Sequence, residues 1–147
     1  MSENDEERLL HEICRNSSMG REAIRQVLEE VYDQEFAYEL HLEAAKMKEF
    51  ENKANSRLNK NGKEEAAAKP VAERMLKSAV KMRTAFSDQT AHVAGMMQKG
   101  NLRGADELKK AIHKYKDAGV YATELAREMI DFEEENQNRL EAYRRDS

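Results

Sequence analysis

The sequence predicts an all-α protein of one domain, and its composition carries most of that prediction. Ala, Glu, Lys, Leu and Arg make up about half of the 147 residues, a share typical of long helices. Val, Ile and Thr, which sheets favour, number only 13, and the chain has a single Pro. A single domain, residues 1–147, suits this length. Apolar residues at helical spacing indicate an antiparallel four-helix bundle with up-down-up-down order.

The first two helices are predicted over residues 3–32 and 33–60. In the first, positions three and four apart form a stripe that faces the core: Leu10, Ile13, Ser17, Gly20, Ile24, Val27 and Val31. A break at residues 16–18 is the alternative and gives five helices in all, although the stripe keeps its phase there. Asp33 is the expected N-cap of the second helix, and Asn61–Gly62 its end.

The other two helices are predicted over residues 70–99 and 101–145. Pro70 suits the first position of a helix, and Gly100 is placed to end the third one. Gly119 falls on the stripe of the fourth helix, where a kink is expected. Because the predicted joints are short, neighbouring helices should run antiparallel.

Composition also argues against several classes of protein. No apolar run reaches the roughly 18 residues of a membrane span, and the acidic N-terminus is unlike a secretory leader. The lone Cys14 has no partner for an internal disulfide, which suits a reducing compartment. A net charge of −4 with mixed signs does not favour a nucleic-acid surface. We therefore expect a cytoplasmic protein that binds neither nucleic acid nor membranes.

Four-helix bundles can hold a di-metal centre made of two Glu and two Glu-x-x-His motifs. None of the four His has a Glu three residues before it, so we predict no catalytic residue, no cofactor and no standard metal centre. A weaker metal site is conceivable from Asp88 and His92, one helical turn apart, with Glu43 beside the second stripe. The alternative is a surface Asp–His pair and a solvated Glu.

Ser17 and Gly20 are two small residues in the middle of the first stripe. They either let a neighbouring helix pack closely or leave room beside the core. Bulky side chains such as Phe86 or Tyr121 can fill that room, and a small-molecule pocket is the functional alternative. Close packing is the simpler prediction.

Cys14 lies beside the first stripe, with His11 three residues before it. A nucleophilic thiol needs such a base and an electropositive setting. A buried structural thiol is the simpler prediction. The eight Met are likewise expected mainly to fill the core rather than to form a soft-metal site or a partner groove.

Several short segments, spread over residues 8–143, carry a family resemblance: Leu10–Asn16, Met19–Gly20, Asp33–Phe36, Met75–Leu76, Val80–Met82, Thr90–Ala94 and Asp131–Asn136. Together they resemble a family of small, uncharacterised bacterial proteins in the ferritin-like superfamily. The resemblance implies a ferritin-like antiparallel bundle in the bacterial cytoplasm. It brings no site residues with it, because the Glu-x-x-His motif of the metal-binding members is missing.

Three hypotheses for function follow from the sequence. The first is a non-enzymatic bundle that self-associates and serves as an interaction or stress-related module. It is favoured because the apolar stripes are complete and no set of catalytic residues is recognised in the sequence. The second is a divergent metal-binding ferritin-like protein that uses Asp88, His92 and nearby carboxylates. The third is a bundle that holds a small ligand near Ser17 and Gly20.

Overall fold

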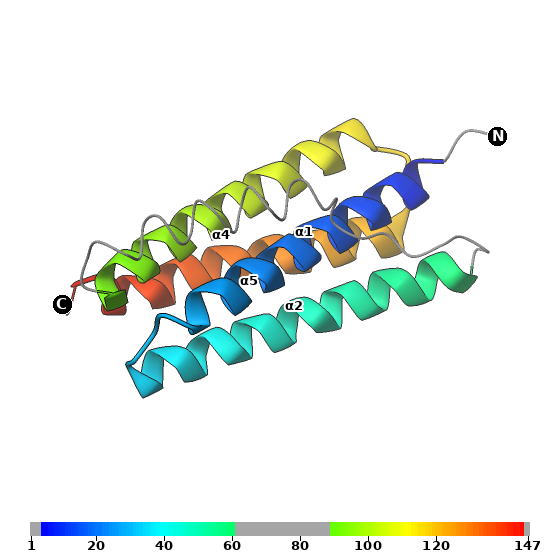
Figure 1. Ribbon diagram of the computed structural model, residues 1–147. Helices are drawn as coiled ribbons and strands as arrows, with labels where there is room; N and C mark the ends of the chain where they lie inside the picture. The colour runs from blue at the N-terminus through cyan, green and yellow to red at the C-terminus, as the bar shows by residue number, and fades with distance from the viewer. Residues whose placement is uncertain (1–3, 61–88, 146–147) are drawn as a thin grey trace.

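Figure 1 shows the computed structural model, in which four helices lie along a common long axis. The structure describes residues 4–60 and 89–145, and every regular element in these ranges is a helix. The helices are α1 (Asp5–Leu28), α2 (Gln34–Lys60), α4 (Gln89–Lys114) and α5 (Val120–Arg145). The all-α prediction is therefore confirmed. None of these helices is long and apolar enough to cross a membrane.

The first half of the chain follows the predicted boundaries closely. Asn4 caps α1, because its Oδ1 accepts a hydrogen bond of 2.8 Å from the backbone N–H of Glu7. Asp33 caps α2 in the same way and accepts from the N–H of Phe36 at 2.8 Å, as predicted. The alternative with a break at residues 16–18 is wrong, because α1 is continuous there.

In the second half, the end of the last helix at residue 145 is as predicted, but the predicted boundary between the third and fourth helices at residues 99–101 is wrong. The helix α4 runs through Gly100 without interruption, and the chain turns instead at residues 115–119. Gly119 has a φ of 88°, a left-handed conformation that glycine adopts without steric cost. Gly100 stays helical, because a glycine inside a helix costs only about 1 kcal/mol. The predicted helix over residues 70–99 lies in part, with Pro70, outside the described residues.

The described helices form two antiparallel hairpins, α1 with α2 and α4 with α5. Asp117 contacts Asp5 and Met129 contacts Ser17, and because both pairs are 112 residues apart, α5 runs parallel to α1. It follows that α2 and α4 run in the same direction. In Figure 1 the end of α2 and the beginning of α4 lie at opposite ends of the bundle. The simple up-down-up-down order with short joints is therefore not found.

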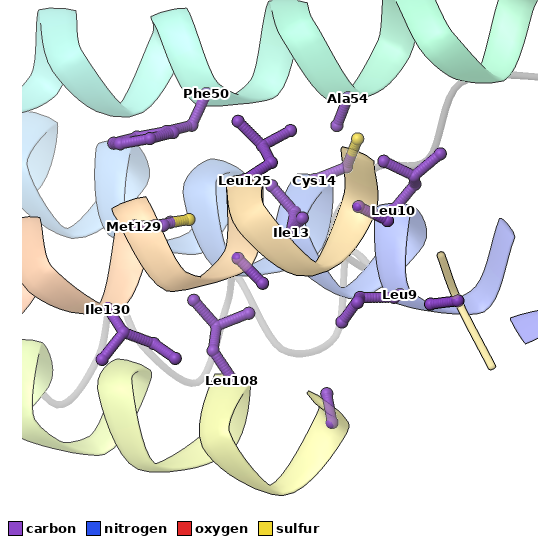
Figure 2. Close-up of a cluster of buried hydrophobic side chains, with 14 of the residues drawn as sticks. Leu9, Leu10, Ile13, Cys14, Phe50, Ala54, Leu108, Leu125, Met129 and Ile130 are labelled. Carbon is purple, nitrogen blue, oxygen red and sulfur yellow. The ribbon is translucent and has the colours of Figure 1, made fainter. Parts of the chain in front are cut away.

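The apolar core is divided into two clusters along the bundle axis. The first contains the N-terminal half of α1, the C-terminal half of α2 and the α4–α5 turn region. In Figure 2, Ile13 of α1, Phe50 of α2 and Met129 of α5 converge in this cluster. The second lies toward the other end, where the rings of Phe36 and Tyr143 stack at 4.8 Å. On α4 and α5, buried polar side chains lie between members of the two clusters, and on α2 Glu43 lies beside members of the second cluster.

Candidate functional site

The polar side chains of the core include two carboxylic acids and two amides that are almost fully buried. Glu43 extends from α2, Asn101 from α4, and Glu133 and Asn136 from α5. Their exposed fractions are 6%, 4%, 1% and 4%. Burying a carboxylate is costly unless a positive charge or hydrogen bonds compensate. These four residues, called the polar layer below, are therefore the most distinctive feature of the core.

Glu133 fits into the layer because α4 has a glycine opposite it. A Cβ atom added at Gly104 would overlap the Glu133 carboxyl group, so any larger residue would displace that side chain. The carbonyl oxygen of Gly104 accepts a hydrogen bond of 3.0 Å from Nδ2 of Asn16, which ties α1 to α4 at this level. Among the described residues, Oε2 of Glu133 has no hydrogen-bond partner.

Burial changes the protonation of both carboxyl groups. Burial and, to a smaller extent, the charges of the Glu43 and Glu107 carboxyl groups together raise the pKa of Glu133 to about 9. Burial also raises the pKa of Glu43, to about 7, although the Asn101 amide and the Arg139 guanidinium act in the opposite direction. At neutral pH the pair therefore holds at least one proton, and Glu133 is the residue that carries it.

A cleft of about 220 Å³ between α2 and α5 reaches the polar layer. Glu43 and Asn136 line its buried part, and the exposed Arg139 also lines it. Nη2 of Arg139 donates a hydrogen bond to Oδ1 of Asn136. The cleft therefore gives the buried carboxyl pair a route to solvent, with one cationic side chain beside it.

The polar layer offers oxygen donors for a cation. Two carboxyl groups and the amide oxygens of Asn101 and Asn136 are the kind of ligand that Mg²⁺, Ca²⁺ and Mn²⁺ prefer. Asn136 stands three residues after Glu133, where the di-metal motif has a His. No group of three or more His, Cys, Asp or Glu that could hold a metal occurs in residues 4–60 and 89–145. With two carboxyl groups and two amides, the layer does not match the ligand set of a standard di-metal centre.

The weaker metal site proposed from the sequence is not assembled in its original form. Asp88 lies outside the described residues. His92 lines a different cleft, of about 400 Å³ between α4 and α5, where Gln98 donates to Glu141 at 2.8 Å. Glu43, by contrast, faces the polar layer, so the alternative of a solvated Glu is wrong.

Ser17 and Gly20 pack closely against neighbouring helices, which confirms the prediction of close packing. Ser17 donates to the carbonyl oxygen of Ile13 at 2.8 Å, and its Oγ lies 3.7 Å from Sδ of Met129. The end of the Met47 side chain fills the space beside Gly20, where a Cβ atom would overlap it. Neither small residue lines the two clefts described above.

The bulky residues proposed to fill that space do not do so in the described structure. Tyr121 is 41% exposed. Its hydroxyl instead donates to the carbonyl oxygen of Lys53 at 3.4 Å. Phe86 lies outside the described residues.

Cys14 is a buried thiol, as the simpler prediction states. Its Sγ donates to Oδ1 of Asn55 on α2, with a separation of 3.1 Å. Cys14 belongs to the first apolar cluster, and Figure 2 shows it near Leu10 and Ile13. Such a setting does not favour the thiolate that nucleophilic chemistry requires.

Sequence reasoning passed over Glu133, Asn101 and Asn136. A signal for the two carboxylates was nonetheless present, because Glu43 lies four residues before Met47 and Glu133 four residues after Met129. Both Met belong to apolar stripes, so both Glu lie on core-facing sides of their helices.

Comparison of the chain with protein-family models, curated proteins and solved structures finds no match. The fold and the polar layer define the chain as a helical-bundle protein with a buried carboxyl pair.

Proposed function

We propose that this protein is a non-enzymatic helical bundle that binds one divalent cation between Glu43 and Glu133. The observation that carries the proposal is the placement of two almost fully buried carboxyl groups from different helices in one polar layer. This is the metal-binding hypothesis from the sequence with a different set of ligands. Glu43 remains, and Glu133 takes the role given to Asp88 and His92.

The physical argument starts from the cost of the buried charges. Two carboxylates in one low-dielectric layer repel each other, and each loses its hydration. Protons remove that cost at neutral pH, and a divalent cation removes it equally well at higher pH. Because Oε2 of Glu133 lacks a hydrogen bond among the described residues, one strong acceptor is available to a cation. Carboxylate and amide oxygens are ligands that suit Mg²⁺, Ca²⁺ and Mn²⁺.

The helix directions support a ferritin-like arrangement as part of the same proposal. Such bundles have one long connection between helices that run in the same direction. Here α2 and α4 run in the same direction, and 28 residues of sequence, 61–88, separate them. A bacterial origin and a cytoplasmic location follow from the resemblance and belong to the proposal too.

The interaction-module hypothesis has less support in the described structure. Large exposed apolar side chains are scattered over three helices and one loop: Tyr32, Tyr38, Leu42, Leu102, Val120 and Tyr121. Scattered exposure of this kind is ordinary for a protein surface and does not define a docking patch. We therefore place cation binding ahead of it.

The proposal is tested with Mn²⁺, whose free concentration is measured by electron paramagnetic resonance. The full chain, freed of metal with chelator and dialysed at pH 8.5, should bind one equivalent saturably. Glu43→Gln and Glu133→Gln should each weaken binding by tenfold or more, since each removes one charged ligand while keeping the side-chain size.

Glu124→Gln is the matched control, because Glu124 lies on α5 but is exposed and pairs with Arg127. It should leave the affinity unchanged. Far-ultraviolet circular dichroism confirms that all variants keep their helices. Absence of saturable binding to the wild-type chain, or unchanged binding in both glutamine variants at the site, overturns the proposal.

A further inference from the structure

Arg139 is the cationic side chain closest to the polar layer on the cleft side. Its backbone lies on α5, about one turn beyond Asn136 and nearly two turns beyond Glu133, and the residue is exposed. Its Nη2 nevertheless reaches the buried Oδ1 of Asn136 and donates to it. It also lies close enough to Glu43 for its charge to favour the ionised form of that carboxyl group.

In this position Arg139 competes with a cation for two of its ligands. The amide oxygen of Asn136 is one of the few neutral oxygen donors in the layer, and Arg139 already uses it. Glu43 is one of the two acidic ligands, and Arg139 already supplies part of its counter-charge. A divalent cation placed between Glu43 and Glu133 would lie next to a guanidinium group, and like charges in a partly buried site repel strongly.

We infer that Arg139 is a built-in competitor that lowers the affinity of the site for divalent cations and leaves Asn136 when a cation binds. The inference rests on the proposed function, since it concerns the same site. Arg139 is here a specificity-determining residue and not a cation ligand. In the cation-free bundle it supplies part of the counter-charge of Glu43, and it sets the cation concentration at which the exchange takes place.

A purely structural role makes a different prediction. If Arg139 only stabilises the α2–α5 contact, its loss should loosen the ligands and weaken cation binding. If it competes, its loss should free Asn136 and remove a repulsive charge, and binding should tighten. The sign of the change in affinity therefore separates the two roles.

The test measures Mn²⁺ affinity by electron paramagnetic resonance for the wild-type chain, Arg139→Met and Arg139→Lys at pH 8.5. At this pH, which lies above the pKa of about 7 of Glu43, that carboxyl group is mostly ionised in the wild-type chain, so proton competition there is small. We expect Arg139→Met to bind Mn²⁺ tenfold tighter or more. Arg139→Lys, which keeps the charge, should stay within about threefold of wild type.

Arg144→Met is the matched control. Arg144 is also an exposed arginine of α5, but it pairs with Glu141 at 3.0 Å and lies against Gly95 on the α4 side. It should leave Mn²⁺ affinity unchanged. Unchanged or weaker binding by Arg139→Met, while wild type binds one Mn²⁺ through Glu43 and Glu133, overturns the competitor role alone. If neither wild type nor Arg139→Met binds Mn²⁺, the proposed function fails and this inference fails with it.

Discussion

The buried acid Glu133 makes the stability of the cation-free bundle depend on pH in a direction opposite to that of ordinary surface carboxylates. In the unfolded chain Glu133 ionises near pH 4.5, and in the folded chain burial raises its pKa to about 9. Between these values the folded state binds one proton more than the unfolded state. The free energy of unfolding therefore falls as the pH rises through this window. The loss begins at about pH 4.5, below which Glu133 is neutral in both states.

The size of the effect follows from the same shift. One extra bound proton changes the free energy of unfolding by about 1.4 kcal/mol per pH unit. Between pH 7 and pH 9 the wild-type chain should lose about 2 kcal/mol, allowing for partial ionisation near the folded pKa. Glu43, whose pKa is raised to about 7, adds its own loss mainly below pH 7.

Replacing Glu133 with Gln removes the titrating group and keeps the size of the side chain. Below about pH 4.5 the variant should be about as stable as wild type, because both then carry a neutral group in the folded and in the unfolded chain. At pH 7 it should already be more stable by about 3 kcal/mol, since ionisation of Glu133 between pH 4.5 and 7 stabilises only the unfolded wild-type chain, and between pH 7 and 9 the difference should grow by about a further 2 kcal/mol.

Urea unfolding followed by circular dichroism at 222 nm, at pH 6, 7, 8 and 9 with chelator present, measures these values. Lys109 and Tyr143 have raised pKa values and titrate above this range, so they do not contribute. Glu124→Gln is the control and should keep the wild-type slope. Parallel stability curves for wild type and Glu133→Gln would refute the reasoning, because the buried proton would then not exist.

Three further predictions concern the glycines and the cation. Gly104→Ala should cost about 1–3 kcal/mol of stability, because its Cβ overlaps the Glu133 carboxyl group, and it should cost little when Glu133 is also replaced by Ala. Urea unfolding of wild type, the two single variants and the double variant tests this. Gly119→Ala should lower the free energy of unfolding by about 1–2 kcal/mol because of the positive φ, whereas Gly100→Ala should raise it by about 0.5–1 kcal/mol. Equal shifts of the unfolding midpoint in the two variants would contradict a turn at Gly119. Mn²⁺ affinity should rise between pH 7 and pH 9, as the cation displaces the proton of Glu133; an affinity independent of pH excludes Glu133 as a ligand.

The first helical hairpin was predictable because its signals are local. Asn4 and Asp33 are strong N-cap residues followed by amphipathic runs, and each makes the capping hydrogen bond that its side chain favours. The turn at Gly119 was missed because a glycine can stand inside a helix or end one. Only the packing of α4 on α5 determines which of Gly100 and Gly119 adopts the left-handed conformation.

The polar layer was less predictable, for a reason that Glu133–Glu135 illustrates. Of these three consecutive acids, Glu133 is buried, Glu134 pairs with Lys109 at the surface, and Glu135 is exposed. A run of charges is typical of a solvated face. The spacing from Met129 indicates that Glu133 lies on a core-facing side, but only the partner helix shows that its carboxyl group is buried. Gly104, 29 positions earlier in the chain, provides the space, and no local pattern connects the two residues.

Composition and apolar spacing were enough to predict the helical structure seen in residues 4–60 and 89–145, since both signals act within single helices. The sequence by itself also determined the first hairpin, because capping side chains bond to backbone groups only three residues away. Tertiary structure alone decided the direction of α4, the position of the second turn and the meeting of Glu43 with Glu133. These depend on contacts between residues that are distant in the chain, where burial raises the energy of a charge that either residue could carry in water without cost.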